Sequence, residues 1–211
     1  MTKIKISRVL SFCGVLAPPT IIIIIIIAGL LTPGYNHLTD TISSLSGQES
    51  ASPGLMTAGF FSYGVLIIGF AYGLYLRLQQ GMKARIIWFT LTLYGVGMIL
   101  AGVFRDSPGV GSGNTNMEGL LHNIFATAAF FSLLIGVWVF AKSVHNKPSW
   151  FGFTWFSIVA TALSLGLSII FILQSPIPYP GLLQRVFYVI PLIWIEMVSI
   201  WLFRLSFIKI Q

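Results

Sequence analysis

The polar stretch PGYNHLTDTISSLS, residues 33–46, lies in the longest interruption between the apolar runs of this chain. It contains no Lys or Arg, but it carries a Tyr, an Asn, a His, an Asp and a row of hydroxyl side chains. Its turn-forming residues predict a loop, which we expect to fold back over one mouth of a helical bundle in a membrane. The structured loop is expected to cover residues 32–55.

The composition of the 211-residue chain points to a membrane. It is 56% hydrophobic and only 8% charged, with a mean hydropathy of +0.90. Soluble domains are about 25% charged, so this chain has too few charged groups to cover a surface that faces water. The net charge of +7 comes from bases in short loops between apolar runs, so it indicates membrane topology and no nucleic-acid partner. The single cysteine, Cys13, allows no internal disulfide.

Six apolar runs are each long enough for a membrane-spanning helix, which needs about 20 residues. They cover approximately residues 9–31, 56–78, 86–104, 120–141, 150–173 and 182–207. The first run is longer than the apolar core of a signal peptide, which is about 7–15 residues. The runs show no alternation typical of a membrane β-barrel. The sequence therefore predicts an all-α, single-domain bundle of six transmembrane helices.

The basic residues predict the orientation of this bundle. Ten of the twelve Lys and Arg residues fall at the termini and in the even-numbered connections; Arg105 and Arg185 fall on the other side. The positive-inside rule then places both termini in the cytoplasm. The first loop and the starts of the fourth and sixth helices would lie on the outer side.

Several polar side chains are predicted to gather at the outer end as a pocket for a lipid head group or a small amphiphile. Arg185 is expected to pair with Asp106, and as a bidentate donor it suits phosphate or carboxylate. Glu118 and His122 are four residues apart and share one helix face. The candidate binding residues are Tyr35, Asn36, His37, Asp40, Ser43, Ser44, Asp106, His122 and Arg185.

These residues also carry a family resemblance. The segments Pro33–Gly34–Tyr35–Asn36 and Ile42–Ser43–Ser44–Leu45 resemble the first loop of a bacterial and archaeal membrane family, domain of unknown function 998. Asp106, His122 and the Gly181-x-x-x-Arg185 motif match further positions of that family, while Ser46 stands where the family usually has Gly. The resemblance implies six helices, an outer polar site and the cytoplasmic membrane of a prokaryote. It supplies no established activity.

The same residues leave two alternatives open, a hydrolase and a purely structural network. A membrane hydrolase acting on a lipid-like substrate would use Ser43 or Ser44 with His122 and Asp106, or a zinc ion held by His122, Asp106, Glu118 and His37. The chain has no Gly-x-Ser-x-Gly elbow, and His122 is the one well-placed His, so we expect neither a metal nor another cofactor. A buried network that only pins the first loop is the structural alternative.

Glu196 is a separate candidate, because it lies inside the last apolar run. An acid within the membrane suggests a functional site, here proton coupling in a transporter. The structural alternative is a protonated side chain hydrogen-bonded to a Ser or Tyr on another helix. Membrane lipids are the expected partners, and a protein partner or a second copy of the chain stays open.

Overall fold

The computed structural model of the chain describes residues 3–47, 50–78, 81–107, 116–173 and 178–205. Within these residues the secondary structure is all helical, and six long helices follow one another along the chain. They are α1 (Lys3–Leu31), α2 (Pro53–Arg77), α3 (Met82–Val103), α4 (Met117–Val144), α5 (Phe153–Ile172) and α6 (Pro180–Leu205). Each of the six is long and apolar enough to cross a membrane. Short 3₁₀ turns occur at Ser43–Ser46 and Pro148–Trp150.

The helices do not begin and end at the same residues as the apolar runs. α1 begins at Lys3, and α4 extends to Val144, past the predicted end at residue 141. Polar residues continue a helix into the interfacial region, where water and head groups solvate their side chains. α5 begins at Phe153, three residues after the predicted start, because Trp150 belongs to the 3₁₀ turn and Gly152 adopts a left-handed φ of 84°. The predicted end of the last helix, residue 207, lies outside the described residues.

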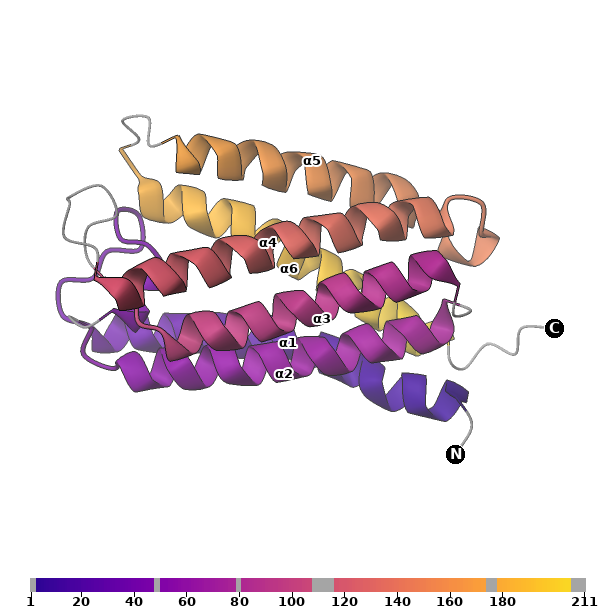
Figure 1. Cartoon of the computed structure of the whole chain (residues 1–211), viewed down its shortest axis with the longest axis horizontal. Helices are drawn as coiled ribbons and strands as arrows, with labels where there is room; N and C mark the ends of the chain where they lie inside the picture. The colour runs from indigo at the N-terminus through magenta and orange to yellow at the C-terminus, as the bar shows by residue number, and fades with distance from the viewer. Residues whose placement is uncertain (1–2, 48–49, 79–80, 108–115, 174–177, 206–211) are drawn as a thin grey trace.

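The six helices form a closed ring in which neighbours in sequence are neighbours in space. Each helix packs on the next, and α6 returns to pack on α1. The first loop and the starts of α4 and α6 lie at one end of the ring, and both chain termini lie at the other end (Figure 1). The ring therefore brings the first loop, the end of α3 and the starts of α4 and α6 together around a shared interior.

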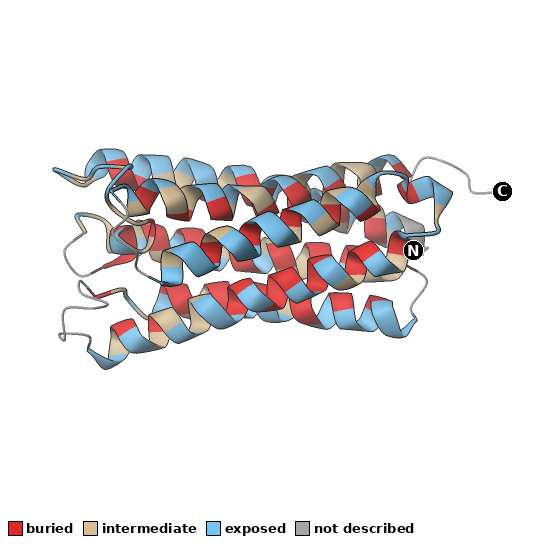
Figure 2. Cartoon of the chain, turned by 90° about the horizontal axis from the view of Figure 1, so that it is seen from above, coloured by how far each residue is buried: buried red, intermediate tan, exposed pale blue. Residues whose placement is uncertain are grey.

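The distribution of burial fits a membrane environment. Buried residues occupy the faces that the helices turn toward one another, and exposed residues occupy the outer faces (Figure 2). Many exposed side chains are large and apolar, such as Phe12, Ile23 and Leu163. Small residues bring helices close: a Cβ on Gly73 of α2 would lie 2.9 Å from Leu10 Cβ of α1. The helices thus bury large apolar side chains together with some small and polar ones, and they keep an apolar outer surface that suits lipid.

Candidate functional site

The first loop is held together by its own side chains. The Tyr35 hydroxyl donates to the Thr41 carbonyl at 2.9 Å, and the Asn36 backbone N–H donates to Asp40 Oδ2 at 2.8 Å. The Leu38 N–H donates to Asn36 Oδ1 at 2.9 Å. Asn and Asp commonly stabilise turns in this way, by bonding to nearby backbone groups. Two predicted binding residues, Asn36 and Asp40, therefore serve the fold of the loop.

Arg185 attaches this loop to the first turns of α6. Its Nη1 donates to the carbonyls of His37 (2.6 Å), Asp40 (2.9 Å) and Gly181 (2.9 Å). Its Nη2 donates to the Tyr35 hydroxyl and lies 3.0 Å from His37 Nδ1. The guanidinium also lies 5.7 Å from the centre of the Tyr35 ring, within the range of a cation–π interaction. Both terminal nitrogens of Arg185 are thus engaged by the protein itself.

The expected pair between Arg185 and Asp106 is not formed. Arg185 bonds to the first loop and its own helix, while Asp106 Oδ1 is buried with no hydrogen-bond partner among the described residues. Neutral carbonyl and hydroxyl oxygens satisfy the guanidinium, and they do so without the desolvation that a buried carboxylate would require. Burial raises the pKa of the Asp106 carboxyl, against smaller lowering effects of His122 and of the Ser107 backbone.

Gln184, which is not among the candidate binding residues, also contacts the loop. Its Oε1 accepts from the Ile42 N–H, and its Nε2 donates to Ser43 Oγ at 3.1 Å. One turn earlier, a Cβ on Gly181 would lie 2.8 Å from the Asp40 carbonyl carbon, so only glycine allows this approach of the loop. The signal in the sequence is its position, because Gln184 is a polar residue beside Arg185 at the start of a mainly apolar helix.

A second set of polar groups lies where α3 ends and α4 begins. His122 of α4 is only 2% exposed, and its Nδ1 lies 2.7 Å from the Ala101 carbonyl and 3.0 Å from the Phe104 carbonyl. Because both partners are acceptors, Nδ1 carries the hydrogen and donates. In the neutral ring Nε2 is then an acceptor, and the described residues offer it no hydrogen bond. The carbonyls at the end of α3 therefore set both the tautomer and the orientation of His122.

Ser107 and Asp106 complete this second set. Ser107 is 6% exposed, and its Oγ is buried with no partner among the described residues. It packs against Gly119, where any Cβ would overlap the hydroxyl. Glu118 is not part of the set, since its Oε1 accepts from the Arg105 N–H at 3.0 Å. We call Asp106, Ser107 and His122 the α3–α4 cluster.

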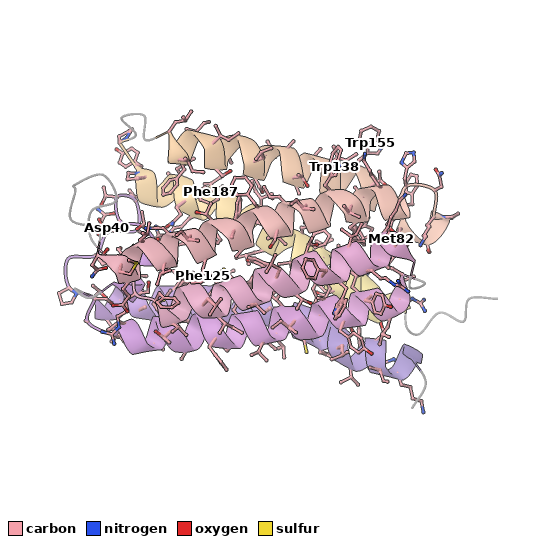
Figure 3. The ribbon with its side chains drawn as sticks, viewed as in Figure 1. Asp40, Met82, Phe125, Trp138, Trp155 and Phe187 are labelled. Atoms are coloured by element: carbon pink, nitrogen blue, oxygen red, sulfur yellow. The ribbon has the colours of Figure 1, made fainter. Side chains whose placement is uncertain are left out.

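The loop and the α3–α4 cluster face one cavity of about 1400 Å³. The part of the cavity beneath the first loop, which we call its mouth, is lined by polar residues. The part farther along the helices is lined by apolar residues such as Ile25, Phe130 and Phe187. Tyr63 and Tyr94 also line it, and their hydroxyls lie 2.8 Å apart. Figure 3 labels Asp40 at the loop end of the bundle and Met82, Trp138 and Trp155 at the opposite end. Of the nine candidate binding residues, only Asn36 does not line the cavity. The eight that do are Tyr35, His37, Asp40, Ser43, Ser44, Asp106, His122 and Arg185.

The structure does not assemble a Ser–His–Asp triad from the candidate catalytic residues. Ser43 Oγ accepts from Gln184, and Ser44 Oγ donates to the Thr41 carbonyl at 2.8 Å. Neither hydroxyl bonds to His122, whose Nδ1 is held by backbone carbonyls. Among the described residues there is also no group of three His, Cys, Asp or Glu side chains placed to hold a metal ion.

Glu196 does not take part in this cavity. It is half-buried on α6, and its Oε2 has no hydrogen-bond partner in the described part of the chain. The expected hydrogen bond to a Ser or Tyr of another helix is therefore not made through that oxygen. Glu196 is absent from the residues that line the cavity.

Comparison with known proteins identifies a family. The family model described as "Protein of unknown function (DUF998)" matches residues 15–201, which is most of the chain and includes the whole cavity. No curated protein and no solved structure gives a significant match.

Proposed function

We propose that this chain, which belongs to the DUF998 family, is a multi-pass membrane protein that binds a lipid-like amphiphile in its interior cavity. The observation that carries the proposal is the shape and chemistry of the cavity. It combines a polar mouth with an apolar depth in one space of about 1400 Å³. Pockets for drug-sized ligands are about 300–1,000 Å³, so there is room here for a head group and a chain.

The charge distribution supports a position of the mouth on the outer side of the membrane. Both termini and the even-numbered connections, which carry most of the Lys and Arg residues, lie at the end away from the mouth. The positive-inside rule assigns that end to the cytoplasm. The amphiphile would then be held in the outer half of the bilayer.

Filling the cavity tests the proposal. Ala126 of α4 lines the cavity, so Ala126→Trp should displace the ligand. Ala128 is exposed on the same helix and does not line the cavity, which makes Ala128→Trp a matched control. Each protein is purified in mild detergent, and the amphiphiles that remain bound are extracted and quantified by mass spectrometry.

The wild type and the Ala128→Trp variant should retain the same amphiphile in near-stoichiometric amount, and Ala126→Trp should lose it. Circular dichroism and the thermal midpoint establish that both variants are folded. Equal amounts of bound amphiphile in all three folded proteins would contradict the proposal.

A further inference from the structure

The polar mouth is what distinguishes one amphiphile from another at this site. Moving an acyl chain from the bilayer to an apolar protein wall changes its environment little, because lipid tails are as apolar as Leu. The deep wall of Ile25, Phe130 and Phe187 therefore accepts chains of many kinds. Selection among membrane lipids depends on which head group the mouth can satisfy.

The mouth is poor in free positive charge. Among the described residues, Arg185 is the only Lys or Arg that lines the cavity, and two carboxylates, Asp40 and Asp106, line it as well. Both terminal nitrogens of Arg185 already donate to the loop. An anionic head group would have to break these bonds or remain unpaired beside a carboxylate. Both alternatives are costly in a site of low dielectric.

The α3–α4 cluster has the opposite character, because its free capacity is mainly for accepting hydrogen bonds. Asp106 Oδ1 and Ser107 Oγ are buried without partners among the described residues. His122 directs a hydrogen from Nδ1 to backbone carbonyls, which leaves Nε2 as an acceptor in the neutral ring. His122 acts electrostatically on Asp106, and Ser107 adjoins Asp106 in sequence, so the three groups lie together on the cavity wall.

We propose that this cluster binds the primary ammonium head of a long-chain amine or aminolipid. This inference rests on the proposed function, the binding of an amphiphile in the cavity. A primary ammonium has three N–H donors and no acceptor, which matches one carboxylate, one imidazole nitrogen and one hydroxyl. Its charge also compensates the buried Asp106 carboxylate, whose Oδ1 has no hydrogen-bond partner in the described chain. A hydroxyl head offers a single donor and no charge, and a phosphate head offers mainly acceptors.

The test compares four amphiphiles with the same chain: dodecylamine, dodecyltrimethylammonium, dodecanol and dodecyl phosphate. Native mass spectrometry of the full-length protein gives the fraction that carries one amphiphile as its concentration is raised. Dodecylamine should bind about tenfold or more tightly than each of the others, since each of them lacks either the positive charge or the N–H donors that the cluster would bond. Equal or tighter binding of dodecyl phosphate, dodecanol or dodecyltrimethylammonium would overturn the assignment of the head group.

Variants locate the binding to the cluster. Asp106→Asn should weaken dodecylamine about tenfold or more and abolish the preference for it. Ser107→Ala should weaken it by a smaller factor. Ser168→Ala is the matched control, because Ser168 also lines the cavity but its Oγ already donates to the Leu165 carbonyl at 2.9 Å. Unchanged dodecylamine binding in folded Asp106→Asn would refute the role of the cluster.

The outcomes separate this inference from the proposed function. If the protein prefers another head group and Ala126→Trp abolishes that binding, the proposed function stands and only the assignment of the ammonium head fails. If Ala126→Trp leaves binding of every probe unchanged, the cavity itself is not the site and both proposals fail. If Asp106→Asn does not fold, the order of affinities in the wild type still decides the head group.

Discussion

Nη2 of Arg185 and Nδ1 of His37 lie 3.0 Å apart, joining residues that are separated by 148 positions in the sequence. The guanidinium can only donate, so His37 Nδ1 accepts and the ring must be neutral in this contact. Burial lowers the pKa of His37 below its ordinary value of 6.5, and the charge of Arg185 lowers it further. The attachment of the loop is therefore sensitive to acid.

The first prediction is that acid weakens the folded loop. Since the pKa of His37 is lower in the folded than in the unfolded protein, the stability it contributes is present above pH 6.5. That stability is lost as the pH falls below 6.5 toward the depressed folded value. The midpoint of thermal unfolding in detergent should fall between about pH 7.5 and about pH 5.5. His37→Asn, whose side-chain oxygen accepts in place of Nδ1 and does not titrate, should show a smaller decrease; an equal decrease would exclude His37 as the cause.

The second prediction concerns Arg185 itself. Arg185→Lys should destabilise the protein by about 2–4 kcal/mol. A lysine ammonium carries its three donors on one nitrogen, so it cannot reach the acceptors that Nη1 and Nη2 of the guanidinium bond separately. The carbonyls of His37 and Asp40 would lose their donor. Arg105→Lys is the control, since Arg105 is exposed at the same end and should tolerate the change. Chemical denaturation and the rate of proteolysis in the first loop measure the two variants, and similar losses in both would count against the Arg185 contacts.

The third prediction concerns the approach of the loop to α6. Gly181→Ala should cost about 1–3 kcal/mol, because the new Cβ would overlap the backbone of Asp40 and push the loop away. Gly166→Ala on α5 is the matched control, because a Cβ there meets nothing within 4 Å. Ala has a higher helix propensity than Gly, so that variant should be neutral or up to about 1 kcal/mol more stable. A Gly181→Ala variant as stable as the wild type would show that the loop is not docked in this way.

The sequence was sufficient to predict the six helices and the meeting of the first loop with Arg185. Long apolar runs predict segments that lie in lipid. A charged residue at the start of an apolar helix needs polar partners nearby. It was not sufficient to identify those partners. Complementary charge suggested Asp106, whereas the structure uses carbonyl oxygens of His37 and Asp40, which every residue possesses and no sequence pattern marks.

Contacts between distant side chains were equally hidden in the sequence. Tyr63 and Tyr94 lie on different helices, and their hydroxyl contact depends on the rotation of α2 against α3. Gln184 contacts the loop only because Gly181 lets the loop approach α6. The cavity likewise depends on how all six helices close into a ring, which hydropathy alone does not determine.

The fourth prediction tests the orientation. In a Cys13→Ser background, a cysteine at Thr39 should react with a membrane-impermeant maleimide added to intact cells, and a cysteine at Asn146 should react only after the cells are opened. Both positions are exposed, and they lie in connections at opposite ends of the bundle. The expected outcome follows from the excess of basic residues at the end that carries Asn146. The reverse labelling pattern would place the mouth of the cavity in the cytoplasm.

The fifth prediction is that Asp106→Asn stabilises the protein without ligand, the reverse of what an ion pair with Arg185 would produce. Burial raises the pKa of Asp106 above its ordinary value of 3.8, so the folded state holds the proton more tightly than the unfolded state. Stability is therefore lost as the pH rises from 3.8 through the folded value, and the loss is complete above it. Asparagine has no charge to bury, and its side-chain oxygen still accepts from the Ser107 backbone.

The measurement is the difference in thermal midpoint between the protein that retains Asp106 and the Asp106→Asn variant, both in a His37→Asn background so that His37 does not titrate. The difference should be small near about pH 4 and should favour the asparagine variant near about pH 7. Dodecylamine should then raise the midpoint of the protein that retains Asp106 and leave the asparagine variant unchanged, because only the carboxylate pairs with the ammonium. A midpoint that falls strongly in Asp106→Asn at neutral pH, with no dependence on pH, would mean that the carboxylate already has a cationic partner in the folded protein.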